Sequence, residues 1–302
     1  MAILAGRTTR VLVQGITGRE AATFTVESIR YGTNIVAGVT PGKGGTKIYD
    51  VPVFDTVSKA LREQPCDTTV ISVPPQAVRD AAWEALDAGI RLLVIVTERI
   101  PRCDVVAILE YAKERVARVI GPNSLGVISP HQCRIGMCGG SVEAIRKAYS
   151  PGSVGIISRS GGMMTEIASL LTQAGIGQTS CVSTGGDPII GSTFADLLPL
   201  YEADAETKAL VLFCEPGGTM EEKLAEHLAK NPSRLGLVAF IAGRFTDRMQ
   251  GVRFGHAGAI VEGTRGSPWG KVAALRKVGI LIAEKLSRIP GLVRVTLNER
   301  RP

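Results

Sequence analysis

Of the three histidines in the chain, His256 has the neighbours that phosphoryl chemistry would need. It lies in the segment Gly255-His-Ala-Gly-Ala259, where small residues let a phosphate group or another chain come close. Imidazole attack on the γ-phosphate of a nucleotide gives a phosphohistidine, which divides one difficult transfer into two easier ones. A core histidine inside a glycine loop is the other interpretation. His131 lacks supporting neighbours, and His227 belongs to a charged helical stretch.

Other residues could assist such a histidine. Glu215 ends an expected strand and precedes Pro-Gly-Gly, so its carboxylate could hold the second imidazole nitrogen and stabilise the charged ring. The segment Ser158-Arg-Ser-Gly-Gly162 spans an expected strand-to-helix turn, where free N–H groups and the helix dipole favour an anion. Gly185-Gly-Asp-Pro188 is a further glycine turn at a strand end. Without a histidine partner, Glu215 would be an ordinary solvated loop acid.

Another phosphate turn lies near the N-terminus, where residues from Val11 to Gly18 predict a strand that ends in glycine and opens a helix. An NAD site would also need an acid near the end of the second strand, yet no Asp or Glu stands between Glu27 and Asp50. That place is taken by a glycine-rich turn containing Lys43, a residue suited to a phosphate. CoA, which carries a pyrophosphate and a 3′-phosphate, fits both turns. The alternatives are a tight turn without a ligand and a solvent-exposed lysine.

The elements that must position these residues alternate between short apolar runs and helical patterns. In the first half, strands are expected at residues 10–14, 34–38, 69–73, 92–96 and 118–120, with helices at 20–31, 56–63, 75–88 and 103–115. In the second half, strands are expected at 154–158, 178–183, 209–214, 237–241 and 292–296, with helices at 162–174, 193–203, 220–230 and 268–278. Such alternation predicts right-handed crossovers and parallel sheets.

We therefore expect an α/β chain in three parts. A Rossmann-like CoA-binding domain would span residues 1–128, and an irregular connector with a short helix would span 129–150. A flavodoxin-like, doubly wound parallel-sheet domain carrying the histidine would span 151–302. Because ligands bind at the carboxyl ends of parallel strands, segments 73–75 and 96–98 should line the first crevice.

Composition narrows the class of protein. The 302 residues are 45% apolar and 21% charged, and no run of 18 apolar residues predicts a membrane span. The net charge of +7 is scattered and accompanies no nucleic-acid-binding module. The six cysteines lack metal-binding spacing, so we expect no metal site and buried thiols in a reducing compartment. With no room for a signal peptide before the first strand, we expect a cytoplasmic protein without nucleic-acid or membrane partners.

Taken together, the motifs resemble the α subunit of succinyl-CoA synthetase (ADP- or GDP-forming) and its relatives malate–CoA ligase, citryl-CoA synthetase and ATP-citrate lyase. The resemblance extends to about Ile289, and we assign no role to the tail from Pro290 onward. The matching segments are Gln14-Gly-Ile-Thr-Gly18, Gly38-Val-Thr-Pro-Gly-Lys-Gly-Gly45, Gly121-Pro-Asn123, Ser158-Arg-Ser-Gly161, Gly185-Gly-Asp-Pro188, Glu215-x-Gly-Gly218 and Gly255-His-Ala-Gly-Ala259.

The resemblance, with the strand ends above, implies a role for each site residue. His256 would be the phosphorylated residue and Glu215 its carboxylate partner. The expected CoA contacts are Thr17, Gly18, Arg19, Glu20, Lys43, Val73, Pro74, Val96, Thr97 and Glu98. The expected phosphate or substrate contacts are Asn123, Ser160, Gly161, Gly162, Thr165, Gly186 and Asp187.

The implied reaction has three steps. A nucleoside triphosphate phosphorylates His256, the carboxylate substrate takes the phosphoryl group as an acyl phosphate, and the CoA thiol displaces phosphate. The sequence has no recognisable P-loop or ATP-grasp pattern. The resemblance therefore implies an ATP-grasp β subunit that binds ATP or GTP with Mg²⁺, in an αβ or α₂β₂ assembly.

Departures from the family pattern concern the substrate. Ser124 stands where the family has cysteine, Thr165 stands where succinate enzymes have tyrosine, and Ala21 replaces a glycine of the CoA turn. Ser158-Arg-Ser-Gly-Gly-Met163 and Gly191-Ser-Thr-Phe194 look more like the citrate-cleaving relatives. Succinate is the family default, with malate or citrate as candidates. A non-catalytic CoA-binding or regulatory protein of the same fold is the alternative function, and the missing acid disfavours an NAD-dependent dehydrogenase.

Overall fold

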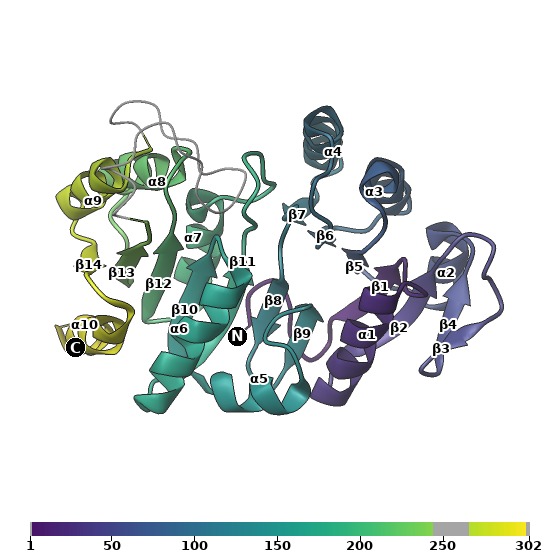
Figure 1. Cartoon of the computed structure of the whole chain (residues 1–302), viewed down its shortest axis with the longest axis horizontal. Coiled ribbons are helices and arrows are strands. Elements are labelled where there is room, and N and C mark those ends of the chain that lie inside the picture. Colours follow the sequence, from purple (N-terminus) through teal and green to yellow (C-terminus); the bar gives the residue numbers. More distant parts are fainter. Residues whose placement is uncertain (1, 244–265, 300–302) are drawn as a thin grey trace.

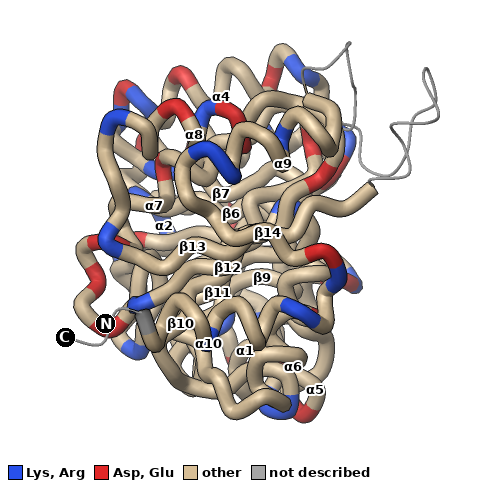
Figure 2. The backbone as a smooth tube through the Cα atoms, turned by 90° about the vertical axis from the view of Figure 1, so that its left-hand side faces the viewer, with Lys and Arg blue, Asp and Glu red and all other residues tan. Residues whose placement is uncertain are grey.

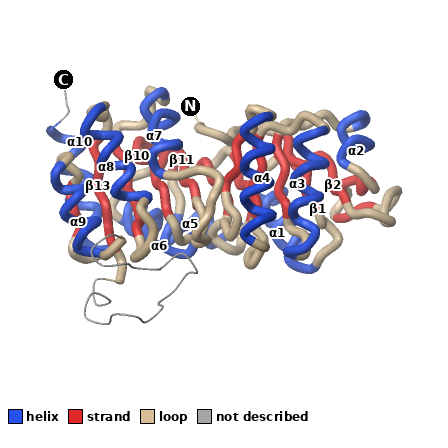
Figure 3. Tube along the Cα trace, turned by 90° about the horizontal axis from the view of Figure 1, so that it is seen from above, coloured by secondary structure: helices blue, strands red, loops and turns tan. Residues whose placement is uncertain are grey.

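Two seven-stranded sheets lie side by side in the computed structural model, which describes residues 2–243 and 266–299 (Figure 1). Helices cover both faces of each sheet, and Figure 3 shows the strands running through the molecule with helices on the outside. This arrangement explains why central strands such as β6 and β12 are continuous apolar runs buried along their whole length. The predicted α/β class is confirmed.

The first sheet has the Rossmann strand order with one extra edge strand. Across the sheet the strands are β3 (Lys47–Ile48), β4 (Val51–Phe54), β2 (Asn34–Val39), β1 (Arg10–Gln14), β5 (Thr68–Ile71), β6 (Leu92–Ile95) and β7 (Arg118–Ile120). All neighbours pair in parallel except β3 and β4. The helices are α1 (Arg19–Tyr31), α2 (Val57–Glu63), α3 (Val78–Asp87), which follows a 3₁₀ turn at Pro75–Ala77, and α4 (Arg102–Glu114).

The second sheet has the flavodoxin order with two added strands. Its strands are β14 (Leu281–Ala283), β13 (Gly236–Ile241), β12 (Ala209–Cys214), β10 (Pro151–Ser158), β11 (Gln178–Ser183), β8 (Gly126–Ser129) and β9 (Cys133–Gly136). The five strands from β10 to β14 are parallel, whereas β8 and β9 are antiparallel to their neighbours. The helices are α5 (Val142–Ala148), α6 (Gly161–Gln173), α7 (Phe194–Ala203), α8 (Met220–Lys230), α9 (Pro268–Lys277), α10 (Ile289–Glu299) and a 3₁₀ turn at Leu286–Arg288.

The two sheets share structure at their junction. The strands β8 and β9 follow the first sheet in the chain but pair with the second. The N-terminal segment is also tied to the second sheet, because the Ile3 amide donates to the Ser180 hydroxyl at 3.2 Å. The Ser129 hydroxyl donates to the Ala5 carbonyl at 2.7 Å. One apolar core therefore includes residues from both sheets.

Several expectations about local structure were wrong. The strand expected at 292–296 lies within helix α10, whose residues Ile289 and Val293 are buried one helical turn apart. A short apolar run fits both periodicities, so the sequence could not separate them. The connector contains the expected short helix, α5, but is less irregular than expected, because it also contains β9. The strands β3, β4, β8, β9 and β14 were not expected. The domain boundaries stay a prediction.

The surface carries both charge signs. Figure 2, which views the end formed by the second sheet, shows Lys and Arg interspersed with Asp and Glu.

Of the six cysteines, four are buried, whereas Cys66 is half-buried and Cys103 is exposed, so the expectation of buried thiols was wrong for Cys103. Within the described residues, no helix is both long and apolar enough to cross a membrane.

Candidate functional site

The first crevice lies where the strand order of the first sheet reverses, between β1 and β5. Connections leave these strands in opposite directions, which opens a cleft at their carboxyl ends. Gly15 follows β1 with a φ of +80°, and a Cβ there would lie 2.2 Å from the carbonyl oxygen of Ser72. Only glycine permits this approach of the two turns.

Two adjoining cavities occupy this crevice. The smaller has a volume of 430 Å³ and the larger 680 Å³, and they share Gly18, Ser72, Val73 and Pro74 in their walls. Thr17 lines the smaller cavity. The larger cavity is also lined by the predicted residues Arg19, Glu20, Val96, Thr97, Glu98 and Asn123. Every predicted CoA contact except Lys43 therefore lines one or both of these two cavities.

Lys43 lies apart from these walls, exposed in the turn after β2. The Asp55 carboxylate holds this turn, because its Oδ1 accepts hydrogen bonds from Gly44 N at 2.9 Å and Gly42 N at 3.0 Å. These contacts, with Gly44 as the largest cause, hold the pKa of Asp55 below its ordinary value. Thr40, which starts the turn, lines the smaller cavity. Asp55 was not expected, and only its position just after β4 could have suggested it.

The second sheet reverses its strand order between β10 and β12, and we call the carboxyl edge there the second crevice, because doubly wound sheets bind ligands at such a place. The turn after β10 leads into α6, and the Ser160 hydroxyl caps this helix by accepting from Met163 N at 3.5 Å. The Ser158 hydroxyl accepts from Ser160 N at 3.1 Å and fixes the turn before the helix. The first turn of a helix presents free N–H groups and positive potential, so this end of α6 suits an anion.

The two glycines that open α6 have different surroundings. A Cβ on Gly161 would lie 2.2 Å from Cγ of Leu125, a residue that also lines the larger cavity. A Cβ on Gly162 would meet no atom within 4 Å. The first glycine thus lets α6 pack against the wall of the first crevice, and the second leaves open space at the helix N-terminus.

Asn123 and Asp187 join the two crevices. The Asn123 side-chain amide donates to Asp187 Oδ1 at 3.0 Å, and Gly186 N donates to the Asn123 carbonyl at 3.4 Å. Gly185 has a φ of +100°, and a Cβ there would lie 2.0 Å from the carbonyl oxygen of Pro122. Since these residues follow β7 and β11, the carboxyl edges of the two sheets meet here.

Glu215 follows β12 on the other side of the second crevice, where it is half-buried. His256 lies outside the described residues. The described residues before this gap end at Gly243, and the N–H of the preceding Ala242 donates to the Cys214 carbonyl at 2.9 Å. It re-enters at Gly266, whose carbonyl accepts from Gly217 N at 2.8 Å. Both ends of the segment that contains His256 are therefore attached beside the strand that carries Glu215.

Comparison with known proteins matches this geometry to a family. A family model described as a CoA binding domain matches residues 6–99, and a model described as CoA-ligase matches residues 157–281. The chain is 45% identical over 298 residues to Succinate–CoA ligase (ADP-forming) subunit alpha 1 of Archaeoglobus fulgidus, with 99% of each chain covered. It is 41% identical over 293 residues to the ADP-forming sulfoacetate-CoA ligase subunit SqwL of an Acholeplasma species, with 97% of each chain covered. The chain belongs to the α-subunit family of the ADP-forming CoA ligases.

Solved structures agree with this assignment. ATP citrate lyase from Methanosaeta concilii, solved with (3S)-citryl-CoA, superposes with a TM-score of 0.90 at 26% identity, covering 98% of this chain and 51% of the lyase chain. The lyase from Methanothrix soehngenii, solved with citrate and coenzyme A, gives a TM-score of 0.89 at 27% identity, covering 98% of this chain and 51% of the lyase chain. This CoA-ligase subunit thus corresponds to about half the length of those lyases.

Thr165 and Ser124, two residues that depart from the family pattern, form side-chain hydrogen bonds inside the protein. The Thr165 hydroxyl lies 2.9 Å from the hydroxyl of Tyr149, a fully buried residue between α5 and β10. The Ser124 hydroxyl donates to the Ser183 carbonyl at 2.5 Å and accepts from Gly126 N at 2.8 Å. The Thr165 hydroxyl also donates to the Gly161 carbonyl at 3.4 Å, so it lies beside the first turn of α6, and Ser124 is engaged in the junction between the sheets.

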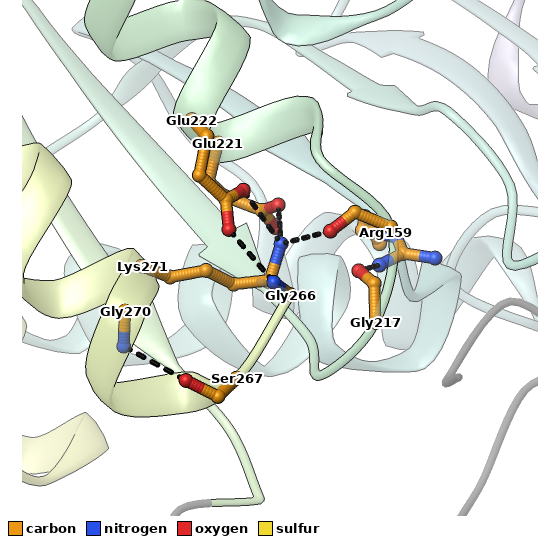
Figure 4. A network of polar contacts seen from close by, with 9 residues as sticks. Arg159, Gly217, Glu221, Glu222, Gly266, Ser267, Gly270 and Lys271 are labelled. Atoms are coloured by element: carbon orange, nitrogen blue, oxygen red, sulfur yellow. Dashed lines mark hydrogen bonds and ion pairs between the residues drawn. The ribbon is translucent and has the colours of Figure 1, made fainter. Parts of the chain in front are cut away.

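Four charged residues near Glu215 were not predicted as part of the site. Arg159, Glu221, Glu222 and Lys271 surround the turn between β12 and α8 (Figure 4). In the sequence, Glu221, Glu222 and Lys271 resemble ordinary helix-surface charges, and Arg159 lies in the turn between β10 and α6. The only available signal was the apolar surroundings of Lys271 in the pattern of α9, which places it on the buried face of that helix.

Proposed function

We propose that this α subunit carries a phosphoryl group on His256 and passes it to a small organic acid beside bound CoA. The observation that carries the proposal is the bond between Asn123 and Asp187, since it brings the CoA-type crevice and the anion-type helix end to one edge of the molecule. A chain that only bound CoA would not need the second crevice. The alternative of a non-catalytic binder is not favoured.

The first crevice fits CoA. The two adjoining cavities suit an elongated ligand, and the close approach at Gly15 leaves backbone facing the pyrophosphate position. Lys43, in the turn that Asp55 holds, would contact the 3′-phosphate. Asn123 and Leu125 line part of the larger cavity, and Leu125 packs against Gly161. A thiol placed at that part of the cavity would lie next to the N-terminus of α6.

The second crevice would hold the phosphoryl group during transfer. The free N–H groups at Ser160 to Gly162 would bind its oxygens, and the helix dipole would stabilise their negative charge. The Glu215 carboxylate would accept a hydrogen bond from the second imidazole nitrogen of His256 and stabilise the positive ring. These roles of His256, Glu215 and the helix end follow from chemistry and family resemblance.

The steps balance as a ligation. The imidazole of His256 attacks the γ-phosphorus of the nucleotide and releases the diphosphate. A carboxylate oxygen of the acid then attacks the phosphorus, which frees the imidazole and forms an acyl phosphate. The CoA thiol loses its proton and attacks the acyl carbon, so that inorganic phosphate leaves and a thioester forms.

The partner and the nucleotide follow from the family. The relatives are named as subunits, so this chain works in a multi-subunit ligase. We propose that the partner is an ATP-grasp β subunit that binds Mg²⁺ and ATP, in keeping with the ADP-forming names of the relatives. The six thiols form no disulfide, which agrees with a reducing, cytoplasmic location.

The substrate is proposed to be a small acid with a second anionic group. Succinate is the first candidate, since the Archaeoglobus relative is named for it. Malate and citrate remain candidates from the sequence motifs, and the name of the Acholeplasma relative adds sulfoacetate. Thioester formation by the reconstituted pair across these four acids identifies the substrate.

Phosphate labelling tests the mechanism. With its β partner, Mg²⁺ and γ-³²P-ATP, the wild-type chain is expected to take up acid-labile, alkali-stable phosphate, whereas His256→Asn is expected to stay unlabelled. The variant should keep its fold and its CoA affinity, because no predicted CoA contact changes. Normal turnover or labelling in His256→Asn would remove the mechanism.

A further inference from the structure

A buried group of charges lies beside the turn that follows Glu215. Lys271 of α9 forms ion pairs with Glu221 and with Glu222, the latter at 3.2 Å (Figure 4). The side chains of Lys271 and Glu221 are 0% exposed, and that of Glu222 is 21% exposed. Arg159, at the end of β10, is also buried. Charges removed from water to this extent need close partners.

The two cations in this group bind consecutive carbonyl groups of the turn. Arg159 Nη1 donates to the Gly217 carbonyl at 3.1 Å, and Lys271 Nζ donates to the Gly218 carbonyl at 3.1 Å. In a trans peptide the N–H points opposite to the C=O. The N–H groups of Gly218 and Thr219 therefore point away from the cations.

The turn adopts a conformation that must be held in place. Gly217 and Gly218 have φ values of +84° and +64°, and a chain of two glycines loses much conformational freedom when it is fixed. Bonds to buried cations restrict both peptide planes at once. Lys271 thus restrains the segment that starts at Glu215.

The same group ties this turn to the returning chain. Gly266 N donates to Glu222 Oε1 at 3.1 Å, and the Gly266 carbonyl accepts from Gly217 N at 2.8 Å. Ser267 then caps α9 by accepting from Gly270 N at 3.0 Å. Lys271 follows within the first turns of that helix, so it connects α8, α9 and the turn between β12 and α8.

A well-packed apolar residue could stabilise the fold at this place at least as well as a buried ion pair. An ammonium group differs from an apolar side chain because its N–H groups donate hydrogen bonds to particular oxygens and so hold those oxygens in place. We propose that Lys271 is a positioning residue for phosphoryl transfer, which fixes the turn behind Glu215 so that its carboxylate meets the imidazole of His256. This inference rests on the proposed roles of His256 and Glu215.

Three variants separate positioning from stability. Lys271→Met removes the ammonium but keeps the length of the side chain. The double variant K271M/E221Q also removes the carboxylate that would be left buried without a cation, so it should recover much of the lost melting temperature. Neither restores the bond to the Gly218 carbonyl. Val293→Ala, on α10, is the control, because it destabilises the second sheet from a buried position away from the turn.

The measurement is single-turnover phosphorylation of each variant in complex with its β partner by rapid quench, beside CoA affinity and melting temperature. We expect both Lys271 variants to be phosphorylated at least tenfold more slowly, with CoA dissociation constants within twofold of wild type. Val293→Ala should keep the wild-type rate despite its lower melting temperature.

The results that would overturn the inference are distinct. A double variant that regains the wild-type rate together with its stability would leave Lys271 a purely structural role, as would an equal loss of rate in Val293→Ala. If the wild-type complex takes up no label, the proposed function fails and this inference fails with it. If wild type is labelled and His256→Asn is not, the proposed function stands and the Lys271 variants decide the inference alone.

Discussion

The amide of Asn123 donates to the carboxylate of Asp187 at 3.0 Å, and this bond connects the carboxyl edges of two separate sheets. Asn123 has a φ of +54°, an uncommon value for a residue other than glycine. Asn tolerates it better than most residues, and its side chain is then directed across the junction. This pair is thus one of the contacts that hold the CoA crevice beside the second sheet, together with the bond from Gly186 N to the Asn123 carbonyl.

Breaking the pair should slow ligation more than it weakens CoA binding. Asp187→Ala is expected to reduce thioester formation about tenfold, which corresponds to about 1.4 kcal/mol, because the two crevices lose their fixed spacing. The CoA dissociation constant, measured by calorimetry, should change less than threefold. Asp196→Ala, which breaks the capping box of α7, is the control. It should lower stability by about 1 kcal/mol and leave the rate unchanged, and an equal loss of rate there would contradict the explanation.

The turn containing Lys43 should recognise the 3′-phosphate. Lys43→Glu is expected to weaken CoA at least tenfold and dephospho-CoA little, since only CoA presents that phosphate to the repelling carboxylate. Asp55→Asn keeps the lysine but weakens the bonds to Gly42 and Gly44, so it should produce a smaller change of the same selectivity. Binding calorimetry with both ligands checks this. Equal losses for CoA and dephospho-CoA would remove the assignment.

The two glycines at the start of α6 should respond oppositely to alanine. Gly161→Ala places a methyl group on Leu125 and should cost about 1–3 kcal/mol. Gly162→Ala meets open space in a helical turn and should be neutral or stabilising by up to about 1 kcal/mol. Urea unfolding of the two variants provides the measurement. Similar stabilities would mean that Leu125 moves aside without cost.

Thiol reactivity should follow burial. Burial raises the pKa of Cys66 to about 11, of Cys133 to about 11 and of Cys138 to about 12, which suppresses the reactive thiolate at neutral pH. Exposed Cys103 should react fast with a disulfide reagent, half-buried Cys66 slowly, and the buried thiols only after unfolding. Because the raised pKa lies above the working range, the Cys66 rate should rise about tenfold per pH unit between 7 and 9. Cys103→Ser should abolish the fast phase, and a second fast thiol in that variant would contradict the prediction.

The sequence was sufficient for most helices and for nine of the fourteen strands in the described residues, because most of those nine are apolar runs closed by glycine or proline turns. Helix α8 was predicted with its observed ends, Met220 and Lys230. Helix α10 was mistaken for a strand, since 292–296 is short and its burial depends on contacts with β13 and α6 that no local pattern reveals. Strand β3 has only two residues, too few for any periodicity.

In the site, as in the fold, local features could be predicted from the sequence and contacts between distant residues could not. Turns at strand ends are local, so Gly18, Val73 and Thr97 could be placed in one crevice before any coordinates. The direction of a side chain within its element is not local. Nothing near Thr165 in the sequence indicates that its hydroxyl meets Tyr149, and the partners of Lys271 lie 50 and 49 residues away in the chain.

Because β8 and β9 follow the first sheet in the chain but pair with the second, the two sheets should unfold together. A fragment cut at residue 128 would divide β8, part it from β9, remove the Ser180 and Ser129 hydroxyls that hold Ile3 and Ala5, and leave apolar edges exposed to self-association. Neither half should melt independently of the other. Scanning calorimetry of the intact polypeptide would then register a single cooperative endotherm, despite an architecture that suggests two separable modules.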